Sequence, residues 1–322
     1  MKETWKKWVH AIIFVGVFLL LLTGVSVFLS PKNNTRRDGM KNQEANGILT
    51  EPEDTVDVLM LGDSESYSSM SPLQIWHDYG VSSYCCGTDS QKLYDTEEFL
   101  RKAFAQQSPN IVILETGTLF RNFSFAEVVL HRASTWFPVF AYHNRWKSLR
   151  WKDLKLDINY TNVESTKGYH FTVDVEAASD EGYMKADSGL APISAWNRGC
   201  VESIQAFCEE YDAQLILMSA PSTVNWNMQR HNSVQKMADE LGVEYVDMNL
   251  MREEIPIDWS RDTRDGGDHL NYYGATKVSA WLGKYLSETK RMPDHRGDGR
   301  FASWNSYYEN LQEKAEDAAV KS

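Results

Sequence analysis

The hydrophobic and polar positions of the chain form short continuous apolar runs, separated by longer stretches with the 3.6-residue period of amphipathic helices. The apolar runs are too continuous for half-exposed strands, so they predict buried parallel strands. These runs cover residues 56–61, 81–86, 110–115, 214–219 and 243–247.

The stretches with helical periodicity lie between the predicted strands and after the last of them. They cover residues 71–79, 94–107, 193–211, 233–241 and 274–286. Regular alternation of strands and helices predicts an α/β fold, a three-layer α/β/α sandwich around a parallel sheet.

Residues 9–29 form a different pattern, because they contain no Asp, Glu, Lys or Arg. At about 1.5 Å of rise per residue, they reach across a hydrocarbon core of roughly 30 Å, and we expect one transmembrane anchor after a short cytoplasmic N-terminus, residues 1–8. A cleaved signal peptide is the alternative, but residues 26–30 offer bulky side chains where a cleavage site needs small ones. Lysines and arginines flank both ends, so the charges do not orient the span.

The remaining chain divides by composition. Residues 30–54 are polar, carry turn signals and predict a flexible tether. We expect one folded domain over residues 55–322, with an insertion at about 120–188 that is rich in Trp, Tyr, His and Arg. Long insertions over the active face of such folds often select substrates.

Composition narrows the function. With 322 residues and 42% hydrophobic content the chain can bury a large core, while a net charge of −12 argues against nucleic acid as a partner. Cys85 and Cys86 are adjacent, and Cys200 and Cys208 lie too far apart along one helix for a bridge within it. No disulfide framework, metal site or cofactor is implied.

Candidate chemistry appears at two separated places. Ser64 follows the first predicted strand, and Asp265, Asp268 and His269 precede the last predicted helix. A serine, a histidine and a carboxylate are the parts of an activated nucleophile. The plainer interpretation is a helix cap after a strand and an acidic loop with an incidental histidine. A metal hydrolase fits poorly, since no H-E-x-x-H partner exists.

Several motifs together resemble the SGNH, or GDSL-type, hydrolase superfamily. The block Leu61-Gly62-Asp63-Ser64 is similar to its nucleophile block, and the last block supplies Asp and His. Residues 142–147, 220–226, 231–232 and 267–275 resemble the membrane-anchored Gram-positive branch, which is similar to the D-alanine transfer protein of lipoteichoic acid synthesis and to alginate O-acetylation proteins. The resemblance runs from about residue 55 to 305 and implies a flavodoxin-like SGNH fold.

The resemblance assigns roles to the candidate catalytic residues. Ser64 would be the nucleophile and His269 the general base, oriented by a carboxylate. The superfamily usually places that Asp three residues before the His, where this chain has Gly266. Asp265 and Asp268 both remain candidates for the orienting role.

An oxyanion hole would combine the backbone N–H groups of Ser64 and Gly87. The superfamily's third donor is an Asn after the third strand, but this chain has Gly117 there. The hydroxyl of Thr116 or Thr118 is the candidate substitute. Loss of one such donor costs on the order of 3 kcal/mol of transition-state stabilisation, so a slow or inactive site is an open alternative.

Candidate substrate-binding residues come from three segments. The insertion contains a stretch rich in basic and aromatic residues, residues 131–155. Its default interpretation is a solvated amphipathic helix. Its functional interpretation is a surface that contacts anionic polymer, lipid headgroups or a membrane partner. Loop capping is the plain alternative for the other two segments. The candidates are His143, Arg145 and Trp146 in the insertion, Ser222, Asn225, Trp226 and His231 after the fourth strand, and Asn271 in the last block.

These observations lead to one leading hypothesis. We expect an extracytoplasmic serine acyltransferase or esterase that adds or removes an O-acetyl or D-alanyl type of acyl group on a cell-envelope polysaccharide or teichoic acid. The resemblance implies a membrane-bound O-acyltransferase as its partner. The alternatives are a tethered hydrolase of small esters and a non-catalytic scaffold with the same fold.

Overall fold

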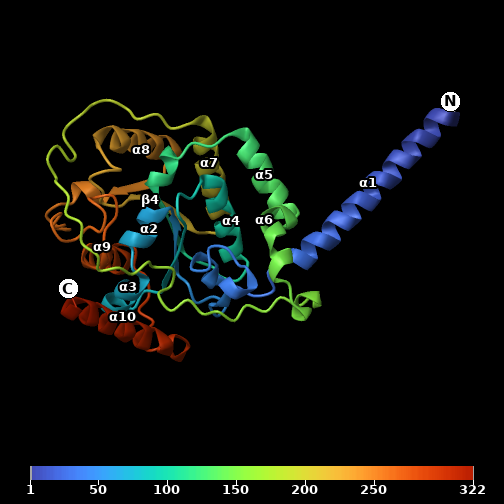
Figure 1. Ribbon diagram of the computed structural model, residues 1–322. Helices are drawn as coiled ribbons and strands as arrows, with labels where there is room; N and C mark the ends of the chain where they lie inside the picture. The colour runs from blue at the N-terminus through green and yellow to red at the C-terminus, as the bar shows by residue number, and fades with distance from the viewer. Residues whose placement is uncertain (1, 322) are drawn as a thin grey trace. The chain divides into compact units, whose positions relative to one another are not determined.

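The computed structural model describes residues 2–321 and contains a five-stranded parallel sheet with the order β2-β1-β3-β4-β5 (Figure 1). This is the strand order of flavodoxin-like folds. The strands are β1 (Val58–Gly62), β2 (Ser83–Gly87), β3 (Ile111–Glu115), β4 (Gln214–Ser219) and β5 (Glu244–Asp247). All five predicted strands are therefore confirmed, and each lies within two residues of its predicted start.

Helices cover both faces of this sheet, as right-handed crossovers require. Helices α3 and α9 share one apolar core with the strands. Helices α4, α7 and α8 form the other layer, in which Phe104 of α4 packs against Phe207 of α7 and Gln205 of α7 donates to the Leu241 carbonyl at 3.1 Å. The bounds are α3 (Pro72–Tyr79), α4 (Leu93–Phe104), α7 (Ala195–Glu210), α8 (Met228–Leu241) and α9 (Tyr272–Lys284).

Two further helices, α2 and α10, were not predicted from the hydrophobic periodicity of the sequence. Helix α2 (Ser64–Ser69) is a short helix after β1, and α10 (Ala302–Lys321) packs its Trp304 against Trp76 of α3. Helix α8 starts at Met228, earlier than its predicted start, because Asn227 caps it by accepting from the Arg230 N–H at 3.0 Å.

The chain forms two compact units. The sheet unit consists of residues 44–122 and 163–321, and the anchor unit of residues 2–43 and 123–162. The predicted insertion is thus divided, since residues 123–162 join the anchor unit and the following residues return to the sheet unit.

The prediction of a flexible tether over residues 30–54 was wrong. Residues 44–54 belong to the sheet unit, where the Lys167 ammonium contacts both carboxylate oxygens of Glu51 at 2.7 and 2.9 Å and both side chains are 2% exposed. Within the anchor unit, the amide of Asn34 donates to the Asn162 carbonyl at 2.9 Å and is fully buried. Polar composition misled here because these polar groups are satisfied by specific partners.

The anchor unit contains α1 (Lys2–Leu29), α5 (Phe125–Trp136) and α6 (Val139–Tyr142), followed by two 3-10 segments, His143–Ser148 and Trp151–Leu154. Among the described residues, α1 is the one helix that is long and apolar enough to cross a membrane, over Thr4–Leu29. A membrane anchor and a signal sequence share these properties.

Candidate functional site

The first part of the site is the junction of β1 and α2. Asp63 is the N-cap of α2 and accepts from the Glu65 N–H at 3.1 Å. Ser64 is the first residue of that helix and is 8% exposed. Its backbone N–H lies in the first turn, where a helix supplies no acceptor of its own. The junction therefore presents a serine at the carboxyl edge of the sheet, where ligands of such folds bind.

The second part is the loop before α9, and it resolves the choice between two acids. His269 Nδ1 lies 2.7 Å from Asp265 Oδ2, and the His269 N–H donates to Asp265 Oδ1, also at 2.7 Å. The corresponding separation from Asp268 Oδ2 is 3.7 Å. The other ring nitrogen, Nε2, is buried and has no hydrogen-bond partner among the described residues. Asp265 thus orients the ring, and Nε2 remains able to accept a proton.

Contacts with α2 and with the segment after β4 hold this loop in place. Arg264 Nη2 donates to Ser68 Oγ of α2 at 2.9 Å. Ser222 Oγ contacts the carbonyl oxygens of Gly267 and Asp268 at 3.0 and 2.8 Å. Gly267 has a φ of +94°, and a Cβ there would lie 2.0 Å from Thr223 Oγ1. The loop fits closely against both α2 and the segment after β4.

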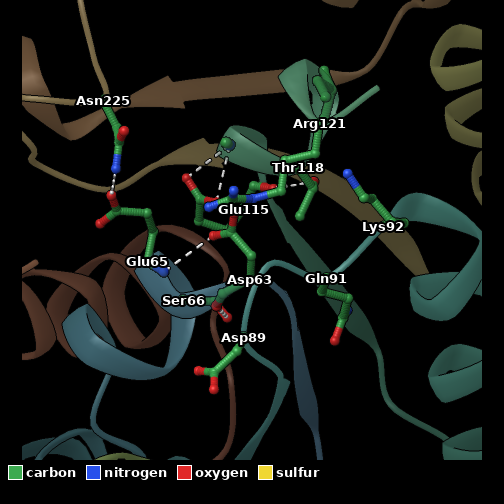
Figure 2. A network of polar contacts seen from close by, with 12 residues as sticks. Asp63, Glu65, Ser66, Asp89, Gln91, Lys92, Glu115, Thr118, Arg121 and Asn225 are labelled. Atoms are coloured by element: carbon green, nitrogen blue, oxygen red, sulfur yellow. Dashed lines mark hydrogen bonds and ion pairs between the residues drawn. The ribbon is translucent and has the colours of Figure 1, made fainter. Parts of the chain in front are cut away.

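Asn225 joins the two parts of the site. Its Nδ2 donates to Glu65 Oε1 at 2.8 Å, as Figure 2 shows, and also to Asp268 Oδ1. Side-chain atoms of Glu65, Asp268 and His269 all lie within 4.8 Å of one another. His269 is therefore beside the residue that follows Ser64, although no hydrogen bond joins Ser64 to His269 among the residues described. Such bonds are often long before substrate binds.

Three buried carboxylates surround this junction (Figure 2). Asp63, Glu65 and Glu115 are 0%, 3% and 1% exposed, and Arg121 forms an ion pair with Asp63. Burial, reinforced by the charges of Glu115 and Asp63, raises the pKa of Glu65 well above its ordinary value. Burial and the charge of Asp63 likewise raise the pKa of Glu115. A single guanidinium pairs with one of these acids, and the low-dielectric surroundings favour protons on the other two.

The hydroxyl groups at the end of β3 were expected to replace the missing oxyanion donor, and their positions disagree with that prediction. The Thr116 hydroxyl is fully buried and shares a 2.5 Å hydrogen bond with Ser219 Oγ. The Thr118 hydroxyl is also buried and donates to the Glu115 carbonyl at 2.8 Å. Both hydroxyls are therefore engaged within the protein.

The backbone donors differ in availability. The Gly117 N–H is bound to both carboxylate oxygens of Glu115 at 3.0 and 2.9 Å. Among these candidate oxyanion donors, the N–H of Ser64 is the one that has no acceptor within its own helix.

Four of the predicted substrate-binding residues in the sheet unit have structural partners. Ser222 is 1% exposed and holds the His269 loop, as described above. Trp226 is 4% exposed and its Nε1 donates to Asp247 at 2.9 Å, and His231 Nδ1 contacts the same carboxylate at 2.8 Å. Asn271 caps α9 by accepting from the N–H groups of Tyr273 and Gly274. These four side chains therefore have partners within the protein and their contact with substrate stays a prediction, whereas Asn225 joins the two parts of the site.

The other three predicted substrate-binding residues belong to the anchor unit. Arg145 is 6% exposed, and its Nη1 donates to the carbonyl oxygens of Leu29 and Ser30, each at 2.7 Å. It therefore caps the end of α1. His143 Nδ1 lies 3.2 Å from the Phe140 carbonyl, and Trp146 is 65% exposed.

Sequence reasoning missed the roles of Glu65, Glu115, Arg121 and Arg264 around the site. Glu115 is the last residue of one predicted strand, and Glu65 lies four residues after the end of another predicted strand. Their position at the carboxyl edge of the sheet was therefore the sequence signal that could have placed both acids near the site. Which acid meets which base depends on side-chain packing across the edge.

A metal is a further chemical possibility for Glu65, Asp268 and His269, whose side chains could each offer one atom. Asn225 binds one oxygen of each carboxylate and Asp265 binds Nδ1 of the histidine, whereas Glu65 Oε2 and His269 Nε2 have no partner among the described residues. The raised pKa of Glu65 also disfavours the charged form that a hard cation requires. This donor set does not fit a metal centre well.

Comparison with known proteins shows that this chain is similar in structure to several solved proteins. No protein-family model and no curated protein sequence matches the chain. Solved structures similar to it include a lipase/acylhydrolase from Enterococcus faecalis, with 11% identity, coverage of 74% of this chain and 98% of that one, and a TM-score of 0.39. An acetyl xylan esterase has 14% identity, coverage of 71% and 98%, and a TM-score of 0.37. A GDSL-like lipase from Bacteroides thetaiotaomicron has 11% identity, coverage of 72% and 88%, and a TM-score of 0.35.

Proposed function

We propose that this chain is a serine esterase or acyltransferase in which Ser64 is the nucleophile and His269 the general base. The observation that carries the proposal is the 2.7 Å contact between His269 Nδ1 and Asp265, with Nε2 buried and unpartnered among the described residues. The loop that holds this pair is fastened to α2, the helix that Ser64 begins.

The chemistry follows from these positions. Ser64 Oγ attacks the carbonyl carbon of an acyl ester, while its proton passes to His269 Nε2. Asp265 stabilises the imidazolium that forms. The leaving alkoxide takes that proton, and an acyl-Ser64 ester remains. A water or an acceptor hydroxyl then attacks the ester carbonyl and gives its proton to His269. The bond between the acyl carbon and Ser64 Oγ breaks, the acyl product leaves, and His269 returns the proton to Ser64 Oγ.

The finer proposal concerns substrate and place. The motif resemblance supports an O-acetyl or D-alanyl type of acyl group on a cell-envelope polysaccharide or teichoic acid, outside the membrane in which α1 would anchor the chain. The same resemblance supports a membrane-bound O-acyltransferase as the partner that supplies or receives the acyl group. Transfer to a sugar or polyol hydroxyl would require that water be kept from the acyl-Ser64 intermediate.

A scaffold without catalysis is the second candidate, and a specific observation favours it. The donors at the end of β3 are already bound, Thr116 to Ser219 and Gly117 to Glu115. A catalytic oxyanion hole with few donors loses about 10²–10³ in rate for each donor that is missing.

A fluorophosphonate probe distinguishes these candidates. The full chain in phospholipid nanodiscs is labelled and digested, and the adduct is located by mass spectrometry, with Ser64→Ala, His269→Ala and Ser66→Ala as variants. An adduct on Ser64 that needs His269 and survives Ser66→Ala supports the enzyme. Absence of any Ser64 adduct in the wild-type chain overturns it in favour of the scaffold. Rapid turnover of small esters by a chain that forms the adduct would identify the tethered hydrolase.

A further inference from the structure

The anchor unit has a set of large apolar side chains that are exposed. Helix α5 lies wholly within the described residues, and each of its residues is at least partly exposed. Val129 and Trp136 are two helical turns apart on one side of α5 and are 49% and 75% exposed. Beyond α5, the exposed side chains include Trp146 at 65%, Trp151 at 89% and Leu156 at 74%. A concentration of this kind marks a protein or membrane contact.

The same unit holds the C-terminal end of α1. Arg145 binds the carbonyl oxygens of Leu29 and Ser30, and its Nη2 pairs with Asp153 at 2.7 Å. The Val139 N–H contacts Ser26 Oγ at 3.4 Å. These contacts fix α6 and the following 3-10 segments to the last turns of α1, and Figure 1 shows α6 beside that end of α1. A membrane crossed by α1 would therefore meet the exposed side chains of this unit.

Tryptophan positions agree with that placement. Trp5 and Trp8, at the start of α1, are 70% and 66% exposed. From Trp8 to Leu29 the helix spans about 30 Å, the thickness of a hydrocarbon core. The exposed tryptophans of α5 and the 3-10 segments belong to the part of the anchor unit that is held at the other end of α1. Membrane proteins concentrate Trp at both boundaries between lipid and water.

Charge favours lipid headgroups over a neutral surface. Residues 125–158 contain six Lys or Arg and three Asp or Glu, in a chain whose net charge is −12. Arg132, Lys147 and Lys155 are exposed. Near an anionic membrane surface, each basic side chain contributes roughly 1 kcal/mol of attraction.

We propose that residues 125–158, which contain α5, α6 and both 3-10 segments, lie in the anionic headgroup layer of the membrane crossed by α1. This inference goes beyond the proposed function and requires only that α1 span the membrane. The occupant of the exposed face is phospholipid. The tryptophans at 136, 146 and 151 insert at the boundary, and the exposed basic side chains face phosphate.

Quenching by brominated lipids tests the proposal. The full chain is placed in nanodiscs of phosphatidylcholine and phosphatidylglycerol whose acyl chains carry bromine near the headgroups, and tryptophan fluorescence is compared with unbrominated discs. The variant Trp136→Phe/Trp146→Phe/Trp151→Phe should lose part of the wild-type quenching. Trp281→Phe, in α9 of the sheet unit, is the matched control and should keep it. Discs of phosphatidylcholine without the anionic lipid should show less quenching of the wild type.

Two results would overturn the proposal. Equal quenching with and without phosphatidylglycerol would remove the role of anionic headgroups. If the triple variant keeps the full fraction of quenched emission, the quenching comes from tryptophans such as Trp5 and Trp8 of α1, and residues 125–158 do not touch lipid. Shielding of the three tryptophans from aqueous acrylamide would then assign the face to a protein, either a second copy or another partner, and full accessibility would assign it to water.

Discussion

The Nδ1 atom of His269 lies 2.7 Å from Oδ2 of Asp265, four residues earlier in the same loop. The second oxygen of that carboxylate accepts from the His269 backbone N–H at 2.7 Å. One acid therefore fixes both the backbone turn and the orientation of the ring. Asp268, although adjacent to the histidine, is engaged by Asn225 instead.

Asp265→Asn should therefore reduce activity far more than Asp268→Asn. Loss of the orienting carboxylate in a serine–histidine site costs roughly 10⁴-fold in rate, because the wrong tautomer is held and the imidazolium loses its partner. Initial rates of Ser64 labelling by the fluorophosphonate, measured for both variants, provide the comparison. An equal or larger loss in Asp268→Asn would contradict the assignment. The conservative change to Asn keeps the size of each side chain, so circular dichroism should show the wild-type fold for both.

Glu65→Gln should change how stability depends on pH. Burial raises the pKa of Glu65 above its ordinary value of 4.5, so between these two values the folded state binds more protons than the unfolded state. The contribution of Glu65 to the free energy of unfolding is therefore fully present below pH 4.5, and it is lost as pH rises through the folded-state pKa. Denaturant titrations at about pH 5 and about pH 8 should show a smaller fall in unfolding free energy for Glu65→Gln than for the wild type.

The exposed Glu181, in the same unit, provides the control for that measurement. Glu181→Gln should leave the pH dependence of the wild type unchanged. A Glu65→Gln curve that is parallel to the wild-type curve would show that Glu65 does not retain its proton on folding.

Gly267→Ala should lower both stability and activity. A Cβ at this position would lie 2.0 Å from Thr223 Oγ1 and 2.8 Å from the Ala178 Cβ, at a φ of +94°. The loop must shift, and displacement of a catalytic group by about 1 Å can cost on the order of 10²-fold in rate. Gly242→Ala is the matched control, because Gly242 also has a positive φ, +68°, but no atom within 4 Å of its Cβ position. Gly242→Ala should lose stability alone, and similar labelling rates in both variants would exclude the clash as the cause.

Lys167→Met should destabilise the sheet unit by about 3–5 kcal/mol, since it leaves the Glu51 carboxylate buried without its partner. The double variant Lys167→Met/Glu51→Gln should recover part of this loss. Unfolding free energies of the wild type, both single variants and the double variant form a thermodynamic cycle. No coupling between the two positions would mean that residues 44–54 are not packed on the sheet in solution.

The sequence by itself determined the parallel sheet, its five strands and the apolar helix α1. These features depend on local hydrophobic patterns, which record burial directly. It also indicated Ser64, because residues that follow parallel strands share one edge of the sheet. His269 and two possible acids were indicated by the motif before the last predicted helix.

Other features were decided by tertiary structure. Local pattern could not choose between Asp265 and Asp268, since the choice depends on Asn225, which lies 43 residues before Asp268 and binds it. Nor could local pattern show that Arg145 caps α1, or that Lys167 forms a buried ion pair with Glu51, 116 residues away. Polar and charged side chains are exposed by default, and only a distant partner can offset the cost of burying them. Hydrophobic spacing along the chain carries no record of such partners, whereas it records the strands of the core.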